Sequence, residues 1–202
     1  MPENDTSAPR HAKRREPARE RLLAAAARRF YTDGVAATGI DTLTAEAGVA
    51  KMSLYNNFSS KEELVLAYLD ARHEEWLELY RRRAAGAATG RDGVLAVFDA
   101  YADHAESAHA HAFRGCGLLN AAAELPAGHQ GRTVTRRHKE DVEALLLGHL
   151  ENLLPDQPGK ARAMAEHLAF LLEGAMARAG LEGTPARMEH ARALAADLLE
   201  RI

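Results

Sequence analysis

One short segment carries side chains with the chemistry needed to read a DNA groove. The outward positions of a short helix predicted there are Lys51, Met52, Ser53, Asn56 and Asn57. Lysine binds phosphate or guanine, asparagine and serine hydrogen-bond to base edges, and methionine contacts a thymine methyl group. The hydroxyl of Tyr55 reaches a phosphate oxygen. The segment is therefore a candidate surface for binding nucleic acid.

The apolar residues around this segment predict two short helices joined by a tight turn. The residues at helical spacing on either side of Gly48 are Ile40, Leu43, Ala47, Val49, Leu54 and Phe58. Such a pair forms a helix-turn-helix, whose second helix can enter the major groove. Ser60 and Glu63 predict a capping box that starts the next helix, where Lys61 and free backbone amides add a phosphate site. The alternative is a helical hairpin with a purely structural role.

The rest of the chain predicts further helices, and no segment alternates as a strand does. Helices are expected over residues 17–33, in two short stretches within 40–58, over 61–83, after Asp92, over 113–125 and 133–154, and around 164–179 and 188–202. The fold class is therefore all-α, with about nine helices. The first three form a small N-terminal domain, and the others form a larger helical domain.

Composition narrows the class of protein. Of 202 residues, 47% are hydrophobic, which indicates a folded globular chain. No apolar run approaches the length of a membrane span, and residues 1–20 lack the apolar core of a secretory signal. The single cysteine, Cys116, excludes an intramolecular disulfide. We expect a cytoplasmic protein with no membrane contact.

The charge is distributed unevenly along the chain. The net charge is −3, yet residues 1–60 hold nine Lys or Arg against seven Asp or Glu, and the remaining 142 residues carry −5. Part of the positive charge lies in the cluster over residues 10–15, within a segment, 1–16, that we expect to be a flexible basic arm. A mildly basic end on an acidic body can present its field to phosphates.

An ordered pattern of residues runs through the predicted helix-turn-helix. It reads Phe30-x3-Gly34-x3-Thr38, then Ala45-x-Ala47-Gly48-Val49-Ala50-Lys51-x-Ser53-Leu54-Tyr55-x2-Phe58-x-Ser60-Lys61-Glu62-x-Leu64. This pattern resembles the N-terminal signature of TetR-family regulators over roughly residues 17–66. The resemblance implies an all-helical homodimer that binds DNA through its first three helices and leaves DNA when a small-molecule effector enters the body.

The resemblance also assigns roles to individual residues. Those expected to face bases are Lys51, Met52, Ser53 and Asn56, and those expected to hold phosphates are Thr38, Thr42, Tyr55 and Lys61. Two residues depart from the family's pattern: Asp41 places an anion near the DNA backbone, and Met52 stands where a small residue is common. The domains implied are a DNA-binding domain over 17–63 and a ligand-binding and dimerisation domain over 64–202.

Beyond residue 66 the sequence offers only candidates for the effector pocket. Large or polar groups on otherwise apolar faces are Trp76, Phe98, Tyr101, Phe113, Asn120, Phe170, Glu173 and Met176. The competing interpretation is that each is ordinary core. Glu173 fits a core least well, because a buried carboxylate needs a cationic or hydrogen-bonding partner. The segment 113–124 resembles one found in a subset of TetR-like proteins but implies no particular ligand.

Histidine and cysteine side chains could support two further chemistries, metal binding and thiol oxidation. His104 and His111 share a helical face while His109 points away, and no HExxH or paired-cysteine spacing exists, so we predict no metal site and no cofactor. Cys116 is either an inert buried thiol or a redox switch.

Three functions remain in view. The leading one is a repressor bound to a pseudo-palindromic double-stranded operator, dimeric through its last two helices and released by an unidentified effector. The alternative is a sensor or adaptor of the same fold without DNA binding, for which Asp41 is the only support. An enzyme is not predicted, since no catalytic triad, P-loop, dinucleotide-binding turn or paired acid is recognisable.

Overall fold

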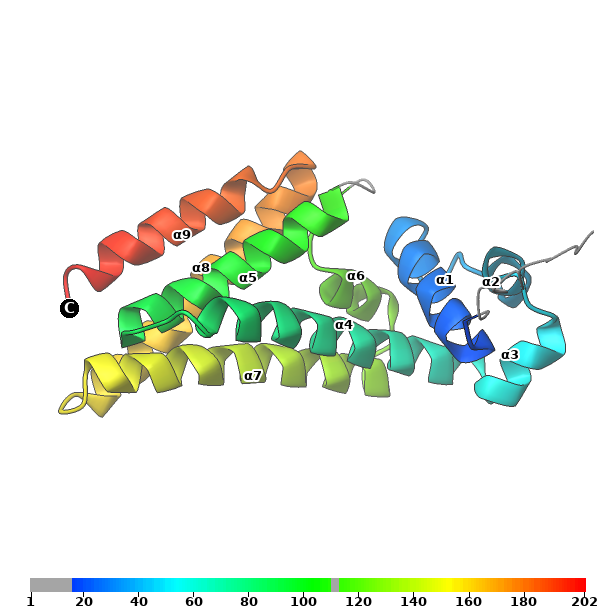
Figure 1. Cartoon of the computed structure of the whole chain (residues 1–202), viewed down its shortest axis with the longest axis horizontal. Helices are drawn as coiled ribbons and strands as arrows, with labels where there is room; N and C mark the ends of the chain where they lie inside the picture. The colour runs from blue at the N-terminus through cyan, green and yellow to red at the C-terminus, as the bar shows by residue number, and fades with distance from the viewer. Residues whose placement is uncertain (1–15, 110–112) are drawn as a thin grey trace, which may run out of the picture.

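The computed structural model describes residues 16–109 and 113–202, and within them it contains nine helices and no strand (Figure 1). The helices are α1 (Ala18–Thr32), α2 (Ile40–Ala47), α3 (Lys51–Asn57), α4 (Lys61–Ala84), α5 (Gly90–His109), α6 (Gly117–Glu124), α7 (Gln130–Leu153), α8 (Pro158–Glu182) and α9 (Ala186–Leu199). The predicted all-α fold is confirmed. The predicted basic arm lies outside the described residues, except for Glu16.

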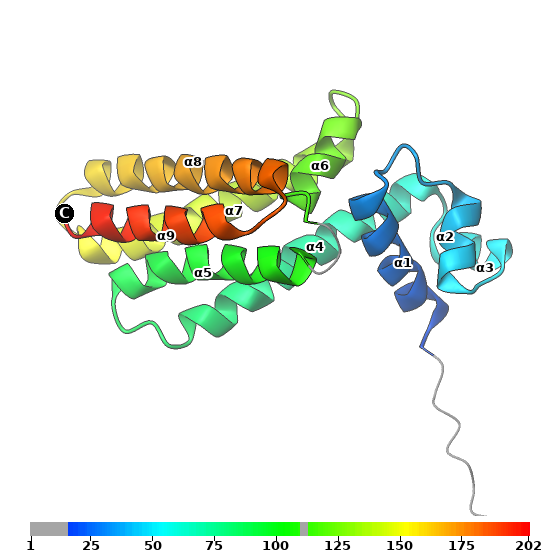
Figure 2. The same cartoon turned by 90° about the horizontal axis from the view of Figure 1, so that it is seen from above.

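The molecule has a small end, here called the head (α1–α3), and a larger body (α4–α9). Figures 1 and 2 show the head at one end of an elongated structure, with α4 running from it along the body. Within the body α4 packs on α5 and α7, while α8 packs on α7 and α9. The short α6 lies between the body and α1, and it contacts α1, α4 and α7. None of the described helices is both long and apolar enough to cross a membrane.

Local sequence signals set most of the helix ends. Gly48 ends α2 with a φ of 60°, in the left-handed region that glycine adopts without steric cost. The hydroxyl of Ser60 accepts a hydrogen bond from the Glu63 backbone N–H at 3.1 Å and so caps α4. The Glu63 carboxylate, however, accepts from the Ser59 backbone and hydroxyl, each at 2.6 Å. In a standard capping box the Glu63 carboxylate would accept from the backbone N–H of Ser60, the capping residue; here it accepts from Ser59, one residue before.

Three predicted boundaries were wrong. Helix α5 begins at Gly90 because Thr89 and Asp92 cap its first turn together, with the Asp92 carboxylate accepting from the Thr89 backbone and hydroxyl. Helix α6 begins only at Gly117, because the preceding residues hydrogen-bond to α1 instead of to one another. Helix α7 begins at Gln130, where the His129 ring accepts from the Gly131 N–H.

Candidate nucleic-acid interface

The head is held together by arginines of α1 that bind α2. Arg21 donates to the carbonyls of Ala47 and Gly48, both at 3.0 Å, and so satisfies the C-terminal end of α2. Arg28 and Arg29 both bind the carboxylate of Glu46, at 2.8 Å. These contacts fix the angle at which α2 and α3 meet α1. In the sequence these three arginines are recognisable only as positive charge.

Helix α3 buries one face and exposes the other. Leu54 is fully buried against the head's core, whereas Met52 is 68% exposed and Tyr55 is 45% exposed. Lys51 and Asn56 are exposed as well. Ser53 is partly buried, and its backbone carbonyl accepts a hydrogen bond from the Asn57 amide at 2.7 Å. Four of the five side chains predicted to read or approach DNA on this helix therefore stand together on its open side.

Lys51 is paired with the acidic residue that departs from the family's pattern. Its Nζ lies 2.9 Å from Asp41 Oδ1, and both side chains are largely exposed. The neighbouring carboxylate raises the pKa of Lys51 above its ordinary value, through the hydrogen bond and the charge attraction. Asp41 thus offsets a charge that would otherwise be available to a phosphate.

The predicted phosphate-binding residues fall in different surroundings. Thr42 is exposed on α2. Thr38 is buried, and its hydroxyl donates to the Gly34 carbonyl at 2.6 Å, so its side chain braces the loop and does not face solvent. The prediction that the Thr38 side chain holds a phosphate is therefore corrected. Lys61 is partly buried and donates to the Val35 carbonyl at 2.6 Å, which leaves two of its three N–H groups for other partners.

The described part of the head carries no excess positive charge. Residues 16–60 contain five Lys or Arg and five Asp or Glu. The excess found for residues 1–60 comes from residues 1–15, which hold four Lys or Arg against two Asp or Glu. The net positive charge of residues 1–60 is therefore contributed by those first residues.

A set of contacts that no sequence pattern indicated joins the body to α1. The Arg114 backbone N–H donates to the Tyr31 hydroxyl at 2.7 Å, and that hydroxyl donates to the Gly115 carbonyl at 3.1 Å. The Arg114 guanidinium donates to the carbonyls of Tyr31 and Thr32, at 2.8 and 2.6 Å. Residues 113–116, here called the 113–116 segment, are thus tied to the last turn of α1. Burial raises the pKa of Tyr31, so its hydroxyl stays neutral.

A second connection joins the far end of α6 to the loop after α1. Glu124 Oε2 accepts the Ala36 backbone N–H at 2.7 Å. Gly34 has a φ of +93°, and a Cβ placed there would lie 2.7 Å from Glu124 Oε1. The positive φ favours glycine at this position, and an added Cβ would also have to displace the Glu124 carboxylate. The presence of Gly34 in the pattern Phe30-x3-Gly34-x3-Thr38 is the one sequence signal that could have pointed to this contact.

The aromatic pocket candidates of the body meet in its interior. Trp76 stacks on Tyr80 and contacts Tyr101 and His138, with ring centroids 5.1–5.8 Å apart. Phe98, Phe113 and Met176 are buried as well, while Asn120 is partly buried on α6. The indole N–H of Trp76 is buried with no hydrogen-bond partner among the described residues. A buried donor of this kind is a place where a ligand with an acceptor atom gains affinity.

Glu173 has the cationic partner that the sequence predicted it would need. Lys139 Nζ lies 2.8 Å from Glu173 Oε1, 3.3 Å from the Tyr101 hydroxyl and 3.5 Å from Cys116 Sγ. Burial by itself lowers the pKa of Lys139, but the surrounding Tyr101, Cys116 and Glu173 raise it above its ordinary value. The second oxygen of Glu173 is buried without a hydrogen-bond partner.

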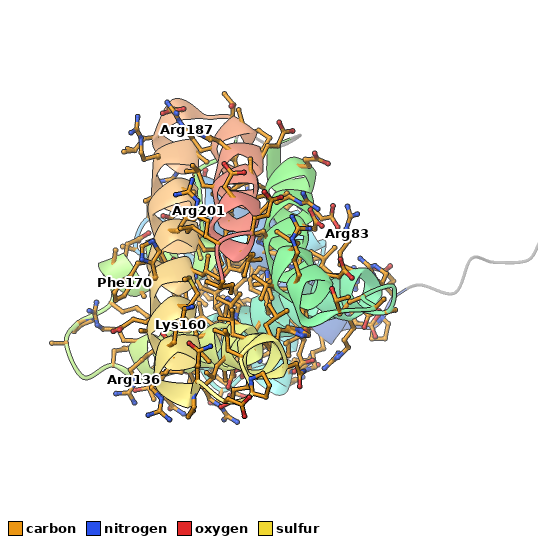
Figure 3. The ribbon with its side chains drawn as sticks, turned by 90° about the vertical axis from the view of Figure 1, so that its left-hand side faces the viewer. Arg83, Arg136, Lys160, Phe170, Arg187 and Arg201 are labelled. Carbon is orange, nitrogen blue, oxygen red and sulfur yellow. The ribbon has the colours of Figure 1, made fainter. Side chains whose placement is uncertain are left out.

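Phe170 does not lie with the aromatic candidates in the interior of the body. It is 67% exposed, and Figure 3 shows it on the outward side of α8. It borders a groove of about 400 Å³ between α8 and α9, together with Leu171, Gly174, Ala191 and Leu194. Because the α8 stripe contains apolar residues on more than one face, periodicity could not distinguish its inner side from its outer side.

The histidines considered as metal ligands do not form a described site. His111 lies outside the described residues, and the side chain of His109 is not described. Within the described part of the chain, no three His, Cys, Asp or Glu side chains are grouped as metal ligands. His138 is instead buried beside His73, with their Nδ1 atoms 2.9 Å apart, and burial lowers its pKa to about 2.

The fold and the exposed face of α3 define a helix-turn-helix protein with a larger helical body. The sequence profile of the bacterial regulatory proteins of the tetR family matches residues 22–68. A TetR-family transcriptional regulator from Streptomyces coelicolor is 31% identical, with 92% of this chain and 95% of that one covered, at a TM-score of 0.81. The chain belongs to the TetR family of transcriptional regulators.

Other relatives extend the comparison. A TetR transcriptional regulator from Chloroflexus aurantiacus is 26% identical over 91% of this chain and 94% of its own, with a TM-score of 0.74. The transcriptional activator FasR of Mycolicibacterium smegmatis is 35% identical over 46% of this chain and 42% of its own length. The transcriptional regulator TtgR of Pseudomonas putida is 43% identical over 28% and 27%. The chain thus aligns with less than half the length of these two curated relatives.

Proposed function

We propose that this protein is a dimeric repressor that binds a pseudo-palindromic operator through α3 and is released by a small molecule bound in its body. The observation that carries the proposal is the exposed cluster of Lys51, Met52, Tyr55 and Asn56 on a helix fixed by the buried Leu54. These are residue types that contact bases and phosphates in a major groove. Residues 17–63 would act as the DNA-binding domain and 64–202 as the effector and dimerisation domain.

The outward face of α8 and α9 is the proposed dimer interface. Phe170, Leu181 and Leu194 are 67%, 90% and 41% exposed on these two helices. Exposed apolar side chains on adjacent helices favour burial against a second copy related by a two-fold axis. We expect Phe170→Glu with Leu194→Glu to produce a monomer in sedimentation analysis. Met52→Glu, which changes an equally exposed residue on α3, should leave the dimer intact, and a dimeric double variant would place the interface elsewhere.

Effector binding would reach the head through α6. Both ends of that helix contact the head: the 113–116 segment precedes its first turn and binds α1, and Glu124 in its last turn binds Ala36. Between them, Asn120 and Cys116 border a pocket of about 440 Å³. A ligand that shifts α6 would therefore change the orientation of the two α3 helices in a dimer.

Repression is proposed over activation because it is the commoner mode in the family, although one relative, FasR, is named as an activator. The second candidate is a sensor or adaptor that does not bind DNA. Asp41 favours it, since this carboxylate neutralises Lys51 at the proposed interface.

The test is selection of genomic fragments by the purified dimer, followed by sequencing and by affinity measurements at several salt concentrations. An inverted repeat, bound with an affinity that falls as salt rises, is the expected result. Enrichment of no sequence at low salt by a folded dimer would contradict the proposal and favour the sensor. A reporter gene placed behind the selected site distinguishes repression from activation.

A further inference from the structure

Two histidines meet between α4 and α7, which pack side by side along the body (Figure 1). The Nδ1 atoms of His73 on α4 and His138 on α7 are 2.9 Å apart, and the two ring planes are nearly perpendicular, at 86°. Two nitrogens bound to one metal ion at about 2.0–2.1 Å, with an angle of about 90–110° between them, are about 2.8–3.4 Å apart. The two Nδ1 atoms are therefore already separated as two ligands of one ion would be.

The second nitrogen of each ring faces an oxygen atom. Asp141 Oδ2 lies 3.8 Å from His73 Nε2, and the Tyr101 hydroxyl lies 3.4 Å from His138 Nε2. Histidines that bind metals commonly direct their second nitrogen to a carboxylate or another oxygen, which orients the ring and sets its tautomer. In the tautomer with a proton on each Nε2, the unshared electron pairs of the two Nδ1 atoms face each other and repel unless a cation lies between them. The surroundings of the pair thus favour a bound cation.

The pair also borders a pocket with an acidic lining. The pocket has a volume of about 240 Å³, and the carboxylates of Asp70, Glu74 and Asp141 line it against one guanidinium, that of Arg137. The charge of this lining favours a cation. Glu74 lies 3.9 Å from a nitrogen of Arg81, whereas Asp70 is exposed and forms no ion pair with the described residues. Asp70 is therefore the carboxylate that is free to turn towards an ion.

The spacing of these residues places them on facing sides of the two helices. Asp70 and His73 are three residues apart on α4, as are His138 and Asp141 on α7. Metal sites in helical bundles use carboxylate and histidine pairs of this spacing on facing helices. As the side chains stand, only the two imidazole nitrogens converge, and no third ligand joins them within the described part of the chain. Rotation of the Asp70 side chain supplies the third ligand, and water completes the set.

We propose that His73, His138 and Asp70 bind a divalent transition-metal ion between α4 and α7. Asp141 and Tyr101 act as the groups that orient the two imidazoles. Imidazole ligands suit zinc, cobalt or nickel, whereas magnesium and calcium prefer oxygen ligands. The local spacings that predicted no metal site could not show this one, because the two histidines are 65 positions apart. The site is independent of the proposed function.

The test uses the untagged full-length protein, stripped of metal and titrated with Co²⁺ and then with Zn²⁺. Equilibrium dialysis is expected to show one ion per protomer, and bound Co²⁺ is expected to give visible absorption bands that Zn²⁺ abolishes. We expect His73→Gln and His138→Gln to weaken binding at least about tenfold, and Asp70→Asn about tenfold. His167→Gln removes an exposed histidine of α8 outside the pocket, and this matched control should bind metal as the wild type does.

Thermal unfolding gives a second readout, because a metal that binds only the folded chain stabilises it. Zn²⁺ at 100 times its dissociation constant should raise the midpoint temperature of the wild type by at least about 5 °C, and that of His73→Gln by much less. Circular dichroism checks the fold of each variant. Asp70 is exposed and His73 is only partly buried, so their variants test the site even if His138→Gln does not fold.

Two results would overturn the assignment. The first is the absence of saturable Co²⁺ or Zn²⁺ uptake by the folded wild type. The second is uptake that His73→Gln and Asp70→Asn leave unchanged, or that His167→Gln reduces equally, which would indicate an adventitious ion only.

Discussion

The contact between Gly34 and Glu124 gives a quantitative test of how the body holds the head. We expect Gly34→Ala to lower the free energy of unfolding by about 2–3 kcal/mol. An L-residue at the observed φ of +93° costs about 1–2 kcal/mol. The new Cβ also forces the Glu124 carboxylate away from the Ala36 N–H, now at 2.7 Å, which removes a hydrogen bond worth about 1 kcal/mol.

The assay is urea and thermal unfolding at one fixed protomer concentration, because dimerisation makes stability depend on concentration. The expected loss corresponds to a fall in the midpoint temperature of about 5–10 °C for a chain of this size. Gly86→Ala, in the turn after α4, is the matched control: its φ is not in the left-handed region and nothing lies within 4 Å of the added Cβ, so we expect a change below about 0.5 kcal/mol.

A double variant separates the two causes. In a Glu124→Ala background the collision is absent, so Gly34→Ala should cost about 1 kcal/mol less than it does in the wild type. Additive costs, within about 0.5 kcal/mol, would show that the carboxylate does not lie against Gly34 in solution. A Gly34→Ala protein as stable as the wild type would refute the reasoning altogether.

Three further predictions concern the head and the buried histidine. Asp41→Asn should tighten operator binding about two- to fivefold at low salt by freeing Lys51, and the effect should shrink as salt rises. The charge-matched control is Asp156→Asn in the distant α7–α8 loop. Equal effects of the two substitutions would refute a local cause. Tyr55→Phe should weaken binding to all sequences alike, whereas Asn56→Ala should relax the sequence preference. Competition with mutated operators measures both effects. An equal loss of affinity on every sequence from both changes would contradict these roles. Burial keeps His138 neutral in the folded state by lowering its pKa to about 2, while the unfolded chain binds a proton below about pH 6.5. Its contribution to stability is therefore complete above that pH and is lost as the pH falls, by about 1.3 kcal/mol between pH 7 and 5.5 in urea unfolding. His138→Gln should reduce that loss by the same amount, and an unchanged pH dependence would contradict the assignment.

Local signals in the sequence predicted the head well. Helix ends at Gly48 and Ser60, and the burial of Leu54 beneath an exposed α3, follow from backbone preference and from the 3.6-residue period, which act over a few neighbouring residues. The partner required by Glu173 was also anticipated, because a buried carboxylate needs compensation wherever it lies. Its identity as Lys139 was not, since the two residues are on different helices.

What the sequence could not predict depends on contacts between distant residues. Thr38 has the residue type of a phosphate ligand, yet packing turns its hydroxyl inward to Gly34. Phe170 has the residue type of a pocket lining, yet it lies on the outer side of α8. The ties from Arg114 to Tyr31 and from Glu124 to Ala36 join residues more than 80 positions apart, and no periodicity records such pairs.

Helix α4 has a mechanical consequence. It begins at Lys61, separated from the end of α3 by three residues, and packs on α7. Its 24 residues make a helix about 36 Å long. If its far end is held by the body, a tilt of about 5° carries its head end through about 3 Å, close to the 3.4 Å rise of one base pair. A small rotation of α4 inside each protomer of a dimer would therefore displace α3 by about one base-pair step. The two α3 helices could then no longer enter successive major grooves at the same time.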